Sequence, residues 1–294
     1  MKKLYVLLFL LTFTSILFAQ QKDGTYTFFN STNSARVAAL GGVTLPIHDS
    51  DIQLTAFNPS LINPEMNNSV SLSYVDYYSD MNFGTVQYGH TFEKIGSFVG
   101  TIQYHDYGDF FYSNENGIVE DNQFSVSDYA VYLGWGRQLN ERFSIGANLK
   151  VGGIQYENNT SFAVAVDVAG TYRAKSNWFF SLAARNIGRE LHNNYQSFRN
   201  ELPFVMQVGA SKKLEHLPFT IVIVYDNLQK WDLSYDDPLD LEGNYDPMTG
   251  QMIEKSKLDI FANNLFSHFV FAGELNLGKN LSLRLGYNYG YRQT

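Results

Sequence analysis

Residues 143–151 read FSIGANLKV, and this stretch decides the fold class. The odd positions carry the apolar residues Phe143, Ile145, Ala147, Leu149 and Val151, and the even positions carry Ser144, Gly146, Asn148 and Lys150. A period of two places apolar side chains on one face of a β-strand and polar ones on the other. The same alternation recurs from Ser69 onward, so we predict an all-β protein.

Eleven segments of about ten residues have this character, and turn residues separate them. They cover residues 69–78, 82–92, 96–108, 124–138, 143–156, 161–173, 178–187, 203–212, 219–228, 268–277 and 281–291. Their connections alternate between short turns, such as 93–95, and long polar connections, such as 109–123 and 227–267. A soluble β-sandwich alternates apolar and polar residues too. Short turns at one end and long loops at the other are typical of bacterial outer-membrane barrels, so we predict an antiparallel transmembrane β-barrel.

Composition agrees with this class. The chain has 294 residues, of which 45% are hydrophobic, 17% charged and 16% aromatic. Aromatic residues lie near the ends of the predicted strands, where barrels carry aromatic girdles; they include Trp135, Tyr156, Tyr172, Trp178, Tyr287 and Tyr289. The sequence has no Cys, which excludes disulfides and thiolate metal sites. A net charge of −8 argues against a nucleic-acid partner.

The first residues resemble an export signal. Lys2 and Lys3 precede an apolar stretch from Leu4 to Phe18, and Ala19 offers a small residue at a cleavage point. A transmembrane anchor is the alternative, but about 15 apolar residues are fewer than the roughly 20 that a helix needs to span a bilayer. We therefore predict a signal peptide over residues 1–19.

Residues 20–68 have a different texture from the strands that follow. Ser34 can cap a short helix over residues 34–40, and Gly41 and Gly42 can end it. The dipeptides Asn58-Pro59 and Asn63-Pro64 then predict turns. We expect this segment to be a plug or hatch for a barrel over residues 69–294. An ordinary periplasmic lead-in is the alternative.

Several of these segments resemble one family of outer-membrane proteins. The stretches are NSARVAALGG (33–42), NPSLINP (58–64), ARNIG (184–188), DNLQKWDL (226–233) and LFSHFV (265–270). Together they are similar to the PorQ-type proteins of the Bacteroidetes type IX secretion system, which are related to PorV and more distantly to the FadL long-chain fatty-acid transporters. The resemblance runs from about Tyr26 to Tyr289 and implies a location in the outer membrane of a Gram-negative bacterium.

The resemblance also implies an architecture and a function. FadL-like barrels have fourteen strands, so with eleven strands here we expect the C-terminal strands to be lacking. PorQ-type proteins imply a non-enzymatic scaffold, without a cofactor, that sits in outer-membrane lipid and holds attachment-complex proteins of the PorZ, PorU or PorV type. The loop from Trp231 to Phe266 would be the docking surface. Its candidate partner-binding residues are Trp231, Tyr235, Tyr245, Phe261 and Phe266.

Three alternatives stay open at this stage. A FadL-like transporter would pass a hydrophobic ligand through an apolar pocket inside the barrel. A barrel hydrolase could pair His90 with His105 across neighbouring strands, although no Ser–His–acid set can be assigned. The acidic loop from Asp236 to Asp246 could bind calcium, yet it fails the EF-hand spacing at Tyr245 and Gln251. The helix predicted near residues 257–266 could cover the barrel mouth or receive a partner.

Overall fold

The computed structural model describes residues 25–32, 34–114, 119–194, 201–233, 256–278 and 280–290. The predicted signal peptide and the acidic loop from Asp236 to Asp246 lie outside these residues. Among the described residues, no helix is both long enough and apolar enough to cross a membrane.

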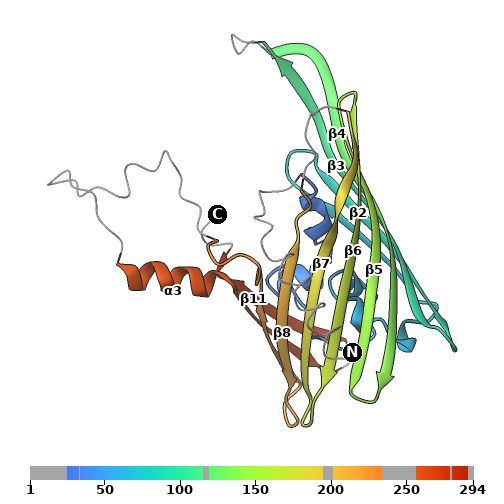
Figure 1. Cartoon of the computed structure of the whole chain (residues 1–294), viewed down its shortest axis with the longest axis vertical. Coiled ribbons are helices and arrows are strands. Elements are labelled where there is room, and N and C mark those ends of the chain that lie inside the picture. The colour runs from blue at the N-terminus through green and yellow to red at the C-terminus, as the bar shows by residue number, and fades with distance from the viewer. Residues whose placement is uncertain are drawn as a thin grey trace, which may run out of the picture.

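In the part of the chain that the structure describes, the strands form one eleven-stranded sheet in which each strand pairs antiparallel with the next (Figure 1). The strands are β1 (Val70–Asp76), β2 (Asn82–Phe92), β3 (Gly96–Ser113), β4 (Val119–Asn140), β5 (Phe143–Tyr156), β6 (Asn159–Arg173), β7 (Trp178–Asn193), β8 (Val205–Lys213), β9 (Phe219–Tyr225), β10 (Phe269–Leu277) and β11 (Leu281–Asn288). The predicted all-β class and strand count are thereby confirmed. The strand order begins at β1 and ends at β11, and within the described residues these two edge strands do not pair with each other.

One predicted connection is wrong. Residues 109–123 were expected to form a long polar loop, but β3 runs to Ser113 and β4 begins at Val119. The two strands pair from Ser97 opposite Gly136 as far as Ser113 opposite Val119, with register shifts after Asp106 and Phe111. Phe110 lies directly opposite Phe124. Cross-strand aromatic pairs stabilise a hairpin, which explains why the strands extend into a polar segment.

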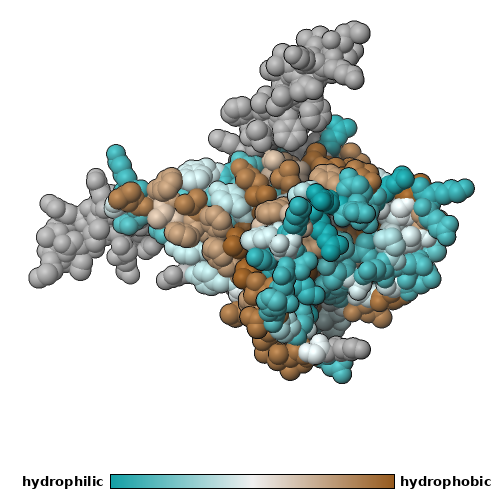
Figure 2. All heavy atoms as spheres, turned by 90° about the horizontal axis from the view of Figure 1, so that it is seen from below, coloured by the Kyte–Doolittle hydropathy of each residue, from teal (hydrophilic) through white to brown (hydrophobic). Residues whose placement is uncertain are grey.

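The two faces of the sheet differ in chemistry. Leu72, Ile102, Val131 and Leu149 are among the apolar side chains that point away from the N-terminal segment, and all four are exposed. Thr101, Gln103, Asn148 and Lys150 alternate with such residues and are buried. From the end where the short turns lie, Figure 2 shows a hydrophilic area flanked by hydrophobic strips. The apolar face of the sheet is thus its outer face.

The N-terminal segment lies within the curve of the sheet (Figure 1). Its elements are the short helices η1 (Thr27–Asn30), α2 (Ala35–Ala39), η2 (Ile52–Ala56), η3 (Pro59–Leu61) and η4 (Pro64–Met66). Helix η3 contacts β4, β5 and β6, whereas α2 contacts β11. We call residues 25–68 the plug. The predicted helix at 34–40 is confirmed as α2, and the Ser34 side chain accepts a hydrogen bond from the Val37 amide.

A second predicted helix is also confirmed. Helix α3 (Lys257–Ser267) precedes β10, and the side chain of Ser256 caps its first turn by accepting from the Leu258 amide. Several of its apolar residues, including Leu258 and Phe261, are exposed. In Figure 1, α3 projects to the side of the sheet.

Candidate functional site

Arg36 connects the plug to the sheet, whose strands β1 to β11 we call the wall. The guanidinium of Arg36 in α2 makes two hydrogen bonds to the Glu274 carboxylate of β10, from Nε at 2.9 Å and from Nη2 at 3.1 Å. It also reaches Asp49 at 2.6 Å and Asp51 at 3.0 Å, which belong to the plug. Arg284 of β11 donates to the same Glu274 at 2.8 Å. Burial alone would lower the pKa of Arg36, but hydrogen bonds and charges from Asp49, Asp51 and Glu274 outweigh it and raise that pKa above its ordinary value.

A second contact lies deep in the sheet. Lys150 of β5 and Asp167 of β6 form a fully buried ion pair with 2.8 Å between Nζ and Oδ2. The ammonium also donates to the Asn186 side chain at 2.9 Å, and Asn186 in turn donates to Asn30 of the plug at 2.7 Å. The ring of Phe29 lies 5.7 Å from the ammonium. The wall charges are thereby satisfied by one another and by plug residues, as buried charges require.

Glycines let the plug backbone approach the sheet closely. A Cβ added at Gly146 of β5 would lie 2.2 Å from the Pro59 carbonyl oxygen, and one added at Gly286 of β11 would lie 2.2 Å from the Gly41 amide nitrogen. Neither neighbour is a flexible side chain, so any larger residue would push the plug backbone away. The plug therefore sits directly on the strands at both places.

The seam between the plug and β1–β3 holds very little space. A cavity of about 30 Å³ lies there, lined by Ser31, Ser34, Gln53, Ala56, Phe57, Ser73, Thr85, Gln87, Thr101 and Gln103. Ligand pockets for small molecules measure roughly 300–1,000 Å³ and are mostly apolar. This cavity has room for about one water molecule, and most of the residues that line it are Ser, Thr or Gln.

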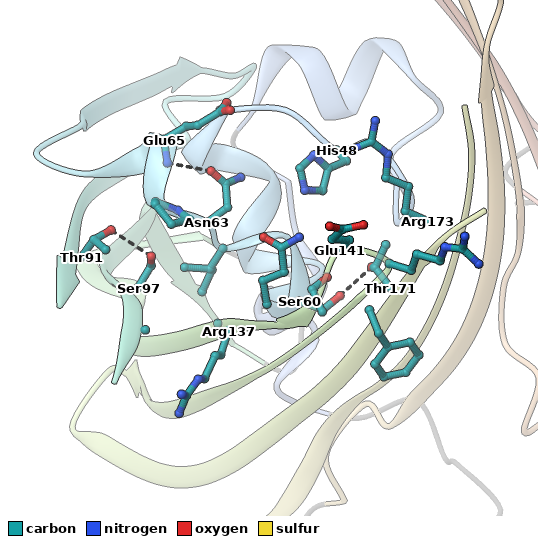
Figure 3. A pocket seen from close by; sticks show the side chains of 18 of the residues that line it. His48, Ser60, Asn63, Glu65, Thr91, Ser97, Arg137, Glu141, Thr171 and Arg173 are labelled. Carbon is teal, nitrogen blue, oxygen red and sulfur yellow. Dashed lines mark hydrogen bonds between the residues drawn. The ribbon is translucent and has the colours of Figure 1, made fainter. Parts of the chain in front are cut away.

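A larger pocket opens at the end where the short turns lie (Figure 3). Its volume is about 650 Å³, and it is bounded by the plug on one side and by the ends of β2 to β7 on the other. Ser60 and Thr171 join the two sides through a hydroxyl contact of 2.7 Å. The charged lining residues balance one another: Arg137, Arg142 and Arg173 against Glu65, Glu93 and Glu141. Apolar residues, among them Ile62, Phe143 and Phe179, complete the lining, so the pocket is of mixed character.

Two of the predicted partner-binding residues come together. The rings of Trp231 and Phe261 lie 5.5 Å apart, and both residues are about half exposed. Phe266 belongs to the same helix but contacts Tyr289 instead, at 6.0 Å. Tyr235 and Tyr245 lie outside the described residues.

His268 holds this aromatic cluster in place, and sequence reasoning missed it. The imidazole lies in hydrogen-bond contact with the Asp226 carbonyl oxygen at 2.8 Å and with the Trp231 carbonyl oxygen at 3.1 Å, and it stacks on the Tyr225 ring at 4.8 Å. A lone His without ligand spacing gives no signal of such a role. Its partners lie about 40 positions earlier in the chain, where no local pattern reveals them.

A partly buried carboxyl group, that of Asp226, follows β9. Burial raises the pKa of Asp226 above its ordinary value, although hydrogen bonds from the Gln207 side chain and the Asn227 amide act in the opposite direction. The carboxyl group anchors the start of the segment that carries Trp231.

The two His residues considered for a hydrolase do not face each other across the strands. The strand register places His90 opposite Phe98 and His105 opposite Phe83, so the predicted pairing of the two His residues is wrong. His105 instead contacts Ser31 of the plug at 3.2 Å, but the Ser31 hydroxyl donates to the Phe28 carbonyl oxygen. The cavity that borders Ser31 has a volume of about 30 Å³, which is too small for a substrate.

In the part of the chain that the structure describes, no group of three or more His, Asp or Glu side chains lies close enough together to hold a metal ion.

Comparison with known proteins does not identify a family. No protein-family model matches the chain, and no curated protein matches it.

Proposed function

We propose that this protein is a non-enzymatic outer-membrane β-barrel that anchors a cell-surface attachment complex of the type IX secretion machinery. The single observation that supports it best is the distribution of side chains on the sheet. Apolar residues such as Leu72, Val131 and Leu283 are exposed on the outer face, and the inner face is polar and covered by the plug. This arrangement fits a protein whose outer-face partner is lipid. The secretion role rests on the family resemblance.

Closure of the sheet is part of the proposal. Ten antiparallel steps separate β1 from β11, so the two edge strands run in the same direction. Direct pairing of these edges would be parallel, whereas an antiparallel closure needs an odd number of further strands between them. Lipid offers no hydrogen bonds to an open edge, which makes closure a requirement of the membrane location.

The plug favours the scaffold over a transporter of hydrophobic compounds. A transporter needs an apolar pocket inside the barrel, but the interior seam has a cavity of about 30 Å³ and the larger pocket carries six Arg and Glu side chains beside its apolar residues. Apolar grooves do occur, as around Ile221, Phe271 and Leu285, but these are exposed residues of the outer face. Such grooves suit acyl chains of surrounding lipid.

The test is affinity purification of the protein from outer membranes in mild detergent, followed by mass spectrometry of proteins and lipids. The scaffold proposal expects a cell-surface attachment protein in stoichiometric amount. Recovery of the barrel alone with a stoichiometric fatty acid would overturn it and favour the transporter. Absence of the protein from the outer-membrane fraction would overturn the membrane location itself.

A further inference from the structure

The hairpin of β3 and β4 is longer than a membrane crossing requires. These strands contain 18 and 22 residues, whereas a barrel strand needs about 9–11 to cross a bilayer. The exposed apolar row on the outer face ends at the pair Tyr104 and Tyr129. Beyond it the register shifts and Gly108 adopts a φ of +78°, which bends the hairpin. Figure 1 shows β3 and β4 reaching past the other strands and curving over. We call residues 106–113 and 119–127 the arm.

Aromatic rings stiffen the arm. Phe110 stacks on Phe124 at 5.6 Å, and Phe124 also contacts Tyr112 at 5.0 Å and Tyr156 of β5 at 5.2 Å. An isolated two-stranded hairpin is marginally stable in water, so this cluster and the contact with β5 supply the rigidity. Phe111 is 55% exposed. The arm therefore presents apolar rings that are already ordered before any partner arrives, which lowers the entropic cost of binding.

The arm also carries uncompensated negative charge. Asp109 and Asp121 are exposed, and neither has an ion-pair or hydrogen-bond partner among the described residues. The sequence has no Lys or Arg between Lys94 and Arg137. Carboxylates beside aromatic faces are the groups that bind guanidinium and ammonium ions, through ion pairs and cation–π contacts. Charge complementarity consequently selects a basic partner surface.

We propose that the arm is a docking surface for a protein partner with an Arg- and Lys-rich face. The inference rests on the proposed function only in that the arm must project from the membrane at the cell surface. It adds a second surface, separate in sequence from the segment between Trp231 and Phe266, and it specifies the charge of the partner.

The first test is photo-crosslinking in intact cells. A photoreactive residue replaces Phe111 in the arm, and a control replaces Leu217, which is 59% exposed in the turn between β8 and β9. We expect a discrete protein adduct from position 111 that is absent from position 217. If position 111 forms no protein adduct, or forms an adduct with lipopolysaccharide only, the proposal is overturned. The same cells are fractionated, because a chain missing from the outer membrane refutes the proposed function, whereas a correctly located chain without the adduct refutes the arm alone.

The second test measures binding of the captured, purified protein to the full chain in detergent. The double variant Asp109→Asn and Asp121→Asn should weaken binding about 5- to 30-fold and flatten its salt dependence. Phe110→Ala should weaken it by about tenfold or more. The control Glu215→Gln removes an exposed carboxylate in the turn between β8 and β9 and should change nothing. Equal affinities for the arm variant and this control would overturn the proposal.

Discussion

Replacing Arg36 with Met should release the plug from the wall. The change leaves the Glu274 carboxylate, whose side chain is 6% exposed, with Arg284 as its remaining ion-pair partner among the described residues. Removing one member of a buried pair costs about 3–5 kcal/mol when the other charge is left without a partner. Because Arg284 still pairs with Glu274, we use the low end of this range. The contact with Asp49, which is 36% exposed, adds about 1 kcal/mol at most. Taking about 3 kcal/mol, the equilibrium for local opening of the plug rises about a hundredfold.

The absence of Cys from the sequence provides the assay. A single Val37→Cys substitution places a thiol in α2 at a side chain with 0% exposure, where alkylation follows the opening equilibrium when opening is fast. In detergent, Arg36→Met should raise the alkylation rate about a hundredfold. Arg284→Met is the matched control, since it removes another arginine from Glu274 without touching the plug. A rate within threefold of the parent, or an equal rise in the control, would refute the assignment of Arg36 as the plug anchor.

Three further predictions concern the wall and its ends. Asp167→Asn should lower the free energy of unfolding by about 3–5 kcal/mol in urea titrations, because it leaves the Lys150 ammonium buried without its ion-pair partner. Adding Lys150→Met removes that ammonium and should recover most of the loss; a double variant as unstable as Asp167→Asn would contradict this. The raised pKa of Asp226 means that the folded state holds its proton more tightly than the unfolded chain does. The contribution of this group to stability therefore falls as the pH rises above 3.8 and through the folded-state pKa. The variant Asp226→Asn should be more stable than the parent at neutral pH but not at pH 3. Val131→Arg on the outer face should lower stability in lipid vesicles by about 2–4 kcal/mol, whereas the same change at exposed Leu217 should have little effect.

Strand positions could be predicted closely because alternation is a local signal. β2 and β5 have the predicted boundaries, and most other strands differ from the prediction by only a few residues. The strands of the arm could not be predicted from the sequence, because residues 106–111 mix charged, glycine and aromatic residues without a clear period of two. The pairing of its two strands depends on contacts across the hairpin, such as Phe110 with Phe124. The pattern of residues along a single strand does not indicate such contacts.

The plug contacts could not be predicted in the same way. Arg36 meets Glu274 across 238 positions, and Asn186 meets Asn30 across 156. Neither pair belongs to a motif, and their proximity exists only once the sheet has curved around the plug. The aromatic cluster could be predicted in part. The sequence indicates Trp231 and Phe261 as aromatic residues of one loop, but their arrangement depends on His268, which the sequence does not indicate.

The energetics of plug release separate the two remaining functions. A hydrophobic ligand that binds with micromolar affinity supplies about 8 kcal/mol, and it can shift the plug only by its differential affinity for the open state. Breaking the Arg36–Glu274 contact alone requires about 3 kcal/mol of that amount, and the Asn186–Asn30 contact and the close backbone approach at Gly146 must then be broken as well. Transport would therefore consume a large part of the ligand's binding energy at each cycle. A scaffold needs no such motion, and every contact that immobilises the plug also stiffens the wall from which the arm and α3 project.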